Sequence, residues 1–254
     1  MGPMNFSLTD TKSGQGERVR YFSRQLITAD DLTQDQIYHR EKRRLHNRLL
    51  HGWGIVCGLD VMVNPTTETP LNLSICRGYA LSCPGDDLYV PTNISFDLAK
   101  CIAGPKAGDC SSPCSPVMTG HVDREVPFYI AIKYSECLSH PVRVSPIGCG
   151  CDDTACEYSR IRDSFEIRCL VDLPKSHEPE KVNDPRSIPE LCAAVGQKVV
   201  PCPSCDEDPW VVLAKITVPT SGPLTAGNVD RSNRRILLSS AILQKNAEKS
   251  CPST

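Results

Sequence analysis

Cysteine is the residue type with the most chemical potential in this chain. There are 15 cysteines among 254 residues, and an odd number leaves at least one thiol without an intramolecular disulfide partner. The first 20 residues lack the basic-then-apolar pattern of a secretion signal, so we expect the reducing cytosol. In that compartment clustered cysteines indicate metal ligands or buried thiols more often than disulfides, and a closed disulfide framework is not expected.

Five cysteines lie in loops rich in Gly, Pro and Asp and are candidate zinc ligands. Cys202 and Cys205 have the C-x2-C spacing that lets two thiolates face one ion from a tight turn, and a tetrahedral site needs two more ligands. The nearest supply is Cys149, Cys151 and Cys156. Free surface thiols, or disulfides formed after release of the protein, are the favoured alternative to zinc. A redox role for the pair is weaker, because neighbouring prolines indicate a loop.

Four other cysteines lie within apolar segments that read as strands. Because free cysteine is among the most buried residue types, we expect these four to be small core residues: Cys57, Cys76, Cys137 and Cys169.

The histidines do not form a catalytic pattern. Half of the six lie between residues 39 and 51, but no H-E-x-x-H motif places two of them on one metal. No Gly-x-Ser-x-Gly elbow, phosphate-binding loop or dinucleotide fingerprint occurs either. The sequence therefore predicts a protein that is not an enzyme and has no catalytic residues.

A basic run is the other feature that could bind a ligand. Its members are Arg40, Lys42, Arg43, Arg44 and Arg48, with Tyr38 and Trp53 nearby. Such a run can contact phosphates. However, the arginines fall on several sides of a helix, and the formal net charge is −2. A solvated face, or ion pairs to a neighbouring subunit, is favoured over a nucleic-acid partner.

The basic run belongs to a predicted long helix that leads into a strand. Thr28 and Asp31 form a shortened capping box, and acidic residues precede basic ones along the helix, as the helix dipole favours. Gly52 is placed to end the helix in a left-handed conformation, and residues 53–63 follow as an apolar strand. The helix has one narrow apolar stripe, formed by Leu32, Tyr38, Leu45 and Leu49. Such a stripe indicates docking on a sheet or on a partner.

The rest of the chain predicts a mainly β fold of the α+β type. Apolar segments that alternate or run continuously predict strands at 71–83, 87–91, 126–134, 164–173 and 210–218. No helical pattern separates them, so an antiparallel β-sandwich or barrel-like core is favoured over parallel units. Long Cys/Pro-rich loops are expected at about 97–125 and 174–209, with a short helix at 187–197, and a strand and helix in the tail 234–249.

The predicted organisation is a flexible segment 1–20, a helix and first strand at 21–60, and a β-rich part 61–254 that forms one domain with the helix. No run of 18 apolar residues occurs, so no membrane span is expected. The composition, 40% hydrophobic, is that of a soluble protein, and a cytoplasmic location is the expectation.

Residues 21–61, YFSRQLITADDLTQDQIYHREKRRLHNRLLHGWGIVCGLDV, resemble a family of bacterial proteins associated with contractile injection systems and phage-tail-like particles. Weaker similarity continues in LSICRGYALSCPGDDLYVP, EYSRIRDSFEIR, WVVLAKITV and NVDRSNRRIL. The resemblance covers about half of the chain. It implies a structural subunit or adaptor at the baseplate or fibre end of such a particle, oligomeric in the assembly, and it implies no catalytic residues.

If the chain is held between other subunits, the first segment should supply the interface or structural signature. Nine residues are the candidates, namely Tyr21, Phe22, Leu26, Tyr38, Leu45, His46, Arg48, Trp53 and Gly54. Arg48 and Trp53 are the residue types that most often anchor interfaces. Packing of the same residues into the chain's own core is the alternative. Two other function classes remain open, a free-standing zinc-binding or redox protein and a nucleic-acid-binding module.

Overall fold

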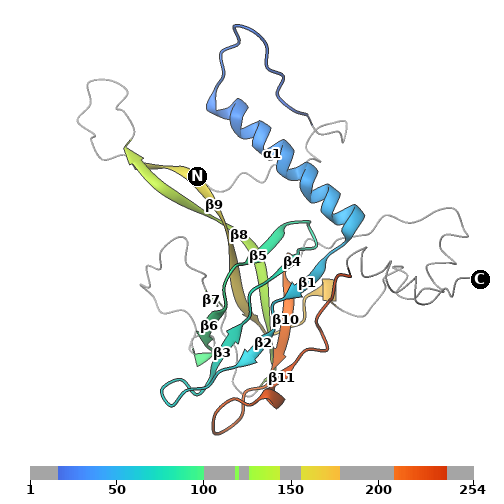
Figure 1. Cartoon of the computed structure of the whole chain (residues 1–254), viewed down its shortest axis with the longest axis vertical. Coiled ribbons are helices and arrows are strands. Elements are labelled where there is room, and N and C mark those ends of the chain that lie inside the picture. The colour runs from blue at the N-terminus through green and yellow to red at the C-terminus, as the bar shows by residue number, and fades with distance from the viewer. Residues whose placement is uncertain (1–16, 100–117, 120–125, 144–155, 178–208, 239–254) are drawn as a thin grey trace, which may run out of the picture.

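The structure is a computed structural model that describes residues 17–99, 118–119, 126–143, 156–177 and 209–238. In this part of the chain, one long helix and a set of strands follow one another as Figure 1 shows. The helix α1 spans Ala29–His46 and continues as one turn of π-helix, Asn47–His51. The single-turn helices are η3 (Lys175–His177) and η4 (Ala226–Asn228).

The strands of the described residues form three sheets. The first, β1-β4-β5, consists of Gly54–Gly58, Gly78–Leu81 and Asp87–Val90. The second, β2-β3-β6, consists of Val61–Val63, Asn72–Ile75 and Ile94–Asp97. The third, β11-β10-β8-β9-β7, consists of Val229–Asp230, Val211–Ile216, Phe128–Arg143, Cys156–Leu170 and Met118–Thr119. Among the described strands, all ladder pairings are antiparallel except that of β7 with β9, and an isolated bridge between Ile55 and Ile236 is also parallel.

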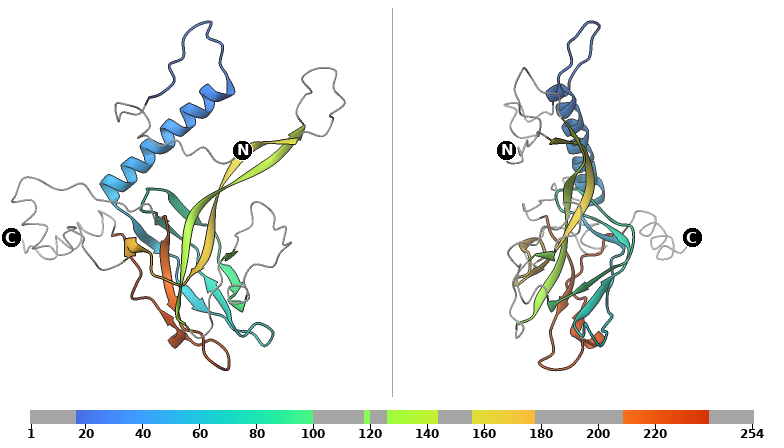
Figure 2. Two further views of the ribbon diagram at one scale, coloured as in Figure 1. Left: turned by 180° about the vertical axis from the view of Figure 1, so that it is seen from behind. Right: turned by 90° about the vertical axis from the view of Figure 1, so that its left-hand side faces the viewer.

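One apolar core holds the three sheets together. Buried aliphatic side chains from every sheet form a single cluster that includes Ile55, Leu73, Ile75, Leu88, Ile130, Ile132, Ile167, Leu213 and Ile216. The alternation along β8 explains its part in this core, since Phe128, Ile130 and Ile132 point the same way from a pleated strand. The two small sheets lie against the large one in Figures 1 and 2. We call this packed unit the body.

The hairpin of β8 and β9 extends well beyond the body. β10 pairs with β8 only at Phe128–Ile132, and β7 pairs with β9 only at residues 167–168. Beyond these pairings, β8 and β9 continue together in one register as far as the pair of Arg143 with Cys156. We call residues 136–143 and 156–163 the arm. Figures 1 and 2 show it leaving the body as a twisted two-stranded ribbon.

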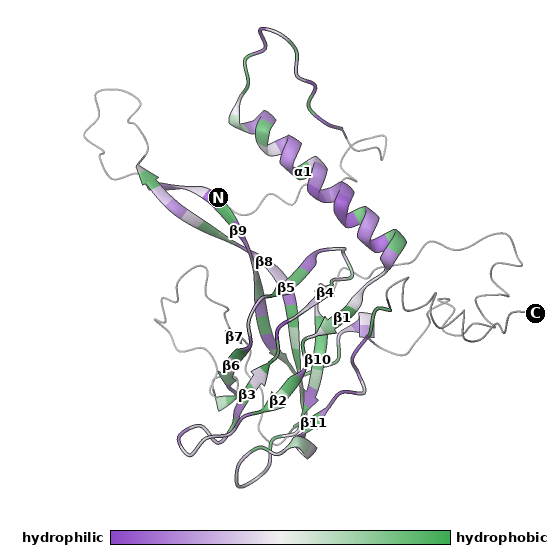
Figure 3. Cartoon of the chain, in the orientation of Figure 1, coloured by the Kyte–Doolittle hydropathy of each residue, from purple (hydrophilic) through white to green (hydrophobic). Residues whose placement is uncertain are grey.

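Helix α1 also projects from the body. The structure describes all 18 of its residues, and none of them is buried. In Figure 3 the helix is mainly hydrophilic, whereas apolar residues gather on the strands of the body. α1 and the arm extend from the same end of the body and lean in the same direction (Figures 1 and 2).

The fold class predicted from the sequence is confirmed, a mainly β fold with one long helix. The predicted capping box is also present, because the Thr28 side chain accepts from the Asp31 N–H and the Asp31 side chain accepts from the Thr28 N–H. Gly52 ends the helix with φ of +77°. The strands β6 and β11 were not predicted, and β7 lies within the expected loop 97–125. The expected helix at 187–197 lies outside the described residues.

The expectations for the cysteines were partly wrong. Cys137 and Cys169 are buried, but both are disulfide-bonded, as is the buried Cys83. Disulfides therefore do form in this chain, but the expectation that no closed disulfide framework forms is not contradicted, because Cys57 and Cys76 are free. Cys57 is an exposed free thiol, and Cys76 is a half-buried free thiol. Cys57 was expected in the core. It is exposed because a bulge in β1 between Ile55 and Cys57 turns its side chain to the face opposite Ile55.

No helix in the described part of the chain is both long enough and apolar enough to cross a membrane.

A half-buried histidine connects two distant segments of the body. His177 Nε2 accepts a hydrogen bond from the Val212 N–H at 3.1 Å, so this nitrogen carries no proton. The ring also packs edge-on against Trp53, with 4.8 Å between centroids. Burial, followed by the charge of Arg235, lowers the pKa of His177 to about 4.

We expect this histidine to make the fold sensitive to acid. The His177 pKa is 6.5 in the unfolded chain and about 4 in the folded chain, so the unfolded chain takes up the proton first. The free energy of unfolding is therefore highest above pH 6.5 and decreases as the pH drops from 6.5 to 4. The integrated loss is up to about 3 kcal/mol. Urea unfolding across this range should show it, and His177→Gln should flatten the profile. The exposed His39→Gln control should not, and equal slopes in all three proteins would contradict the assignment.

Candidate interface: two projecting elements and the polar junction that orients them

A tight turn between β4 and β5 receives the C-terminal end of α1. Within this turn, the Asp86 N–H donates to Ser82 Oγ at 2.9 Å and the Gly85 N–H donates to the Ser82 carbonyl at 2.9 Å. Gly85 has φ of +101°, and a Cβ placed on it would lie 2.2 Å from the Arg44 carbonyl oxygen. Glycine is therefore required here by both backbone conformation and contact with the helix.

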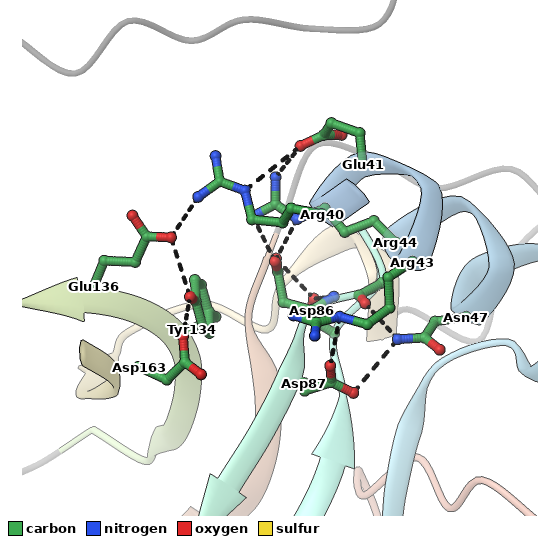
Figure 4. Close-up of polar contacts among 12 residues, drawn as sticks. Arg40, Glu41, Arg43, Arg44, Asn47, Asp86, Asp87, Tyr134, Glu136 and Asp163 are labelled. Carbon is green, nitrogen blue, oxygen red and sulfur yellow. Dashed lines mark hydrogen bonds and ion pairs between the residues drawn. The ribbon is translucent and has the colours of Figure 1, made fainter. Parts of the chain in front are cut away.

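Arg44 is the central contact between the helix and this turn. Its Nη2 lies 2.5 Å from Asp86 Oδ1, and its Nη1 lies 2.7 Å from Glu41 Oε1 (Figure 4). Asp86 is itself buried. Burial lowers the pKa of Arg44, but the two carboxylates more than offset this and hold the pKa above its usual value. The guanidinium is thus charged and neutralised within the contact.

Two neighbouring residues complete the attachment of the helix. Arg43 Nε lies 3.2 Å from Asp87 Oδ2, although the Arg43 side chain is 63% exposed. Asn47, which is buried, donates from Nδ2 to the Gly85 carbonyl at 2.9 Å. The Tyr79 hydroxyl also donates to Asp87, and burial together with this bond raises the pKa of Tyr79. Asp87 is therefore held on the strand side as well as on the helix side.

Arg40 connects the helix to the arm. Its guanidinium forms an ion pair with Glu136, the first residue of the arm (Figure 4). On the arm side the Tyr134 hydroxyl lies 2.7 Å from Asp163 Oδ1 and 3.1 Å from Glu136 Oε1. Burial and the hydrogen bond to Asp163 raise the pKa of Tyr134, so the phenol stays protonated and donates. We call these contacts of α1 with the 82–87 turn and with Glu136 the polar junction.

Beyond the polar junction, apolar side chains are exposed on the segment that leads into α1, on the first turn of α1 and on the arm. On the helix side these are Tyr21, Phe22, Leu26, Ile27 and Leu32, and on the arm they are Leu138, Val142, Tyr158 and Ile161. Leu26 is 86% exposed and Ile161 is 60% exposed. Leu138 and Ile161 are directly paired across the arm and so share one face, the face that also carries Glu136 and Asp163. We call these nine residues the distal surface.

The structure distributes the nine sequence-predicted interface residues over three environments. Tyr21, Phe22 and Leu26 belong to the exposed distal surface. The four on the helix and its π-turn, Tyr38, Leu45, His46 and Arg48, are half-buried or exposed. Trp53 and Gly54 are buried in the body. The arm residues of the distal surface were missed, because their polar strands carry little alternation to mark them.

Trp53 and Gly54 contact the segment near residue 235. The Arg235 guanidinium stacks on the Trp53 ring, 4.4 Å from its centroid. The Ile55 N–H donates to the Arg235 carbonyl at 2.8 Å, and a Cβ on Gly54 would lie 2.7 Å from the same oxygen. Nearby, Arg231 Nε donates to Asp60 Oδ1 at 2.6 Å. The structure therefore brings together two segments, 53–61 and NVDRSNRRIL, that are far apart in the sequence.

The candidate zinc ligands are not placed by the structure. Cys149, Cys151, Cys202 and Cys205 lie outside the described residues, and Cys156 is the first residue of β9, without a described side chain. Among the residues that are described, no three His, Cys, Asp or Glu side chains come together as a metal site. Zinc stays a prediction from the sequence.

Comparison with protein-family models and with curated proteins finds no match for this chain.

The adjacent arginines Arg43 and Arg44 give a matched test of the polar junction. Arg44→Met leaves the buried Asp86 without its counter-ion and should lower the free energy of unfolding by about 2 kcal/mol. Arg43→Met removes an ion pair whose arginine is largely exposed and should cost about 0.5 kcal/mol or less. Urea denaturation of both variants measures the difference, and equal losses would show that Arg44 does not hold the helix.

Gly85 and Gly222 provide a second matched pair. Both have positive φ, but a Cβ on Gly222 meets nothing within 4 Å. Gly222→Ala should therefore cost about 1 kcal/mol from backbone strain alone. Gly85→Ala should cost clearly more and should speed amide exchange in residues 40–47, because the helix must move away from the turn. Similar losses in the two variants would contradict the close approach of turn and helix.

Proposed function

We propose that this chain is a non-enzymatic structural subunit or adaptor of a contractile injection system, at the baseplate or fibre end of a phage-tail-like particle. Within that proposal it is assembled in the cytoplasm as one component of an oligomeric particle. The proposal takes its particle from the resemblance of residues 21–61 and its mode of action from the architecture. The observation that carries it is the pair of projecting elements with an oriented base and exposed apolar ends.

The distribution of burial supports an interface role. The core of the body is complete without α1, because none of the helix residues, all of them described, is buried. A two-stranded ribbon such as the arm is marginal in water by itself. The distal surface nevertheless presents nine apolar side chains at the ends of these elements. Apolar and aromatic residues on oriented projections are typical of surfaces that pack against another protein.

Nucleic-acid binding is less well supported than a protein interface. Three of the five basic residues of the run, Arg40, Arg43 and Arg44, form ion pairs with carboxylates of the same chain. Lys42 lies over the Tyr38 ring, 5.8 Å from its centroid. Most of the positive charge that suggested phosphate contacts is therefore already neutralised, which lowers the expected electrostatic attraction to a nucleic acid.

The experiment that tests the proposal is a density gradient of native lysate, analysed by mass spectrometry. The chain should sediment with sheath and tube proteins, and the association should survive moderate salt because the distal surface is largely apolar. If intact particles sediment while this chain stays wholly in the light fractions, the proposal fails.

The distal surface should carry the association. Leu26→Glu and Ile161→Glu place charges on exposed positions, so each variant should fold with a stability within about 0.5 kcal/mol of wild type. Both should nevertheless lose most of their co-sedimentation with particles. Met62→Glu is the matched control, since Met62 is 44% exposed on β2 of the body. Loss of association in the control alone, or in none of the three, would place the interface elsewhere.

A further inference from the structure

The side of α1 that points away from the arm is acidic. Arg40 marks the side toward the arm, because its guanidinium pairs with Glu136 (Figure 4). At about 100° per residue, Asp31 and Asp35 lie on the opposite side of the helix, together with Tyr38. All three side chains are half-buried, so each keeps part of its surface in solvent. We call this the acidic side of α1.

The basic residues of the chain do not neutralise the acidic side. Residues 29–38 contain no lysine or arginine. Among the described ion pairs, Asp31 takes part in none, and Asp35 only lies 3.8 Å from the imidazole of His39. Hydrogen bonds from Thr28 lower the pKa of Asp31, so this carboxylate is charged while it caps the helix. The acidic side therefore presents negative charge that a partner can neutralise.

The face of the arm that points away from α1 is basic. Glu136 pairs with Arg40, so the face that carries Glu136 and its cross-strand partner Asp163 lies toward the helix. Side chains alternate along a strand, so every second residue of β9 counted from Arg162 lies on the opposite face. These residues are Tyr158, Arg160 and Arg162, and all three are exposed. Neither of these two guanidinium groups has a carboxylate partner among the described residues. We call this the basic face of the arm.

We propose that the acidic side of α1 in one copy of this chain binds the basic face of the arm in a second copy. Within one copy, α1 and the arm leave the same end of the body (Figures 1 and 2), and these two surfaces point away from each other. They can meet only between copies, where each finds the opposite charge. The inference names a partner for the interface role under the proposed function, and it rests on that role.

The residue types and the geometry both suit such a contact. Opposite charges on the two surfaces favour this pairing, whereas acidic against acidic or basic against basic is disfavoured. Arginine and tyrosine, which occur on the basic face, are residue types that often anchor protein interfaces. The contact joins two different surfaces and is therefore heterologous, so each added copy leaves one acidic side and one basic face open. Copies can then continue into a ring or an open array.

Sedimentation velocity of the purified full-length chain at low ionic strength is the first test. Exposed thiols are alkylated with iodoacetamide beforehand, so that disulfides between chains do not form. The sedimentation coefficient should rise with protein concentration past that of a dimer, because the contact is heterologous. Added salt should reverse the rise, because the contact joins charged surfaces. A wild-type chain that stays monomeric at every concentration, or an association that salt does not weaken, would overturn the proposal.

Charge reversal then identifies the two surfaces. Asp35→Arg and Arg160→Glu should each weaken self-association about tenfold or more. An equimolar mixture of the two variants should recover it, because the two reversed surfaces attract each other and the two unchanged surfaces still do. Glu68→Arg and Arg77→Glu are the matched controls, since both residues are exposed on the body, and they should associate like wild type. Variants that associate like wild type, or a mixture that does not recover, would refute the contact.

This contact and the particle assignment can fail separately. Ile161 lies on the face of the arm opposite Arg160, so Ile161→Glu should lose association with particles and keep self-association of the purified chain. If the wild-type chain self-associates but never sediments with particles, the contact stands and the particle assignment fails. If it sediments with particles but stays monomeric by itself, the particle assignment stands and a second copy is not the partner.

Discussion

The direction of helix α1 depends on charge rather than on apolar packing. None of the residues in this helix, every one of which is described, is buried, so its amphipathic face cannot supply the usual energy of docking. Arg44 and Asn47 replace it with directional bonds to one turn, and Gly85 lets that turn approach the helix backbone. Directional contacts of this kind fix an angle in a way that a smooth apolar contact does not. The body can therefore be stable for its own reasons while the junction decides where the helix points.

The parts of this arrangement that the sequence predicted are those with local causes. The Thr28–Asp31 cap, the stop at Gly52 and the alternation of Phe128, Ile130 and Ile132 all depend on neighbouring residues or on one strand face. The mainly β class followed from the same signals, because periodicity reports which face of an element is buried.

The parts that could not be predicted depend on contacts between distant residues. The basic run gave no sign of its partners, since Asp86 and Glu136 lie 42 and 96 residues away from Arg44 and Arg40. The length of the arm was missed because strands that cover no core need no apolar alternation. The exposure of Cys57 depends on a single bulge. In each of these cases the deciding information lies in the packing of the whole chain.

Residues 53–61 and the segment NVDRSNRRIL show a physical reason for their residue types once they are placed in space. Gly54 must be a glycine because the Arg235 carbonyl approaches it, and Trp53 is covered by the Arg235 guanidinium. Asp60 receives hydrogen bonds from Arg231 and Arg234. Residues 53–61 and 229–235 therefore form one structural unit at the base of the helix, and a signature of this kind needs no catalytic role to explain its residues.

This unit and the polar junction hold the two ends of the short stretch, from Arg44 to Ile55, that connects helix α1 to the body. The segment from Gly52 to Ile55 fixes the start of the body through Trp53 and the Arg235 carbonyl. Arg44 and Asn47, only one to two turns earlier, fix the end of the helix on the β4–β5 turn. With both sides of the connection held, the direction of the helix is set at Gly52 from both ends, and so is the place where the apolar segment 21–27 joins it. Rigid presentation lowers the entropic cost that a partner must overcome on binding. An exposed helix joined to its body by a free hinge would lose that advantage, and the paired contacts at Arg44 and Trp53 are what prevent it.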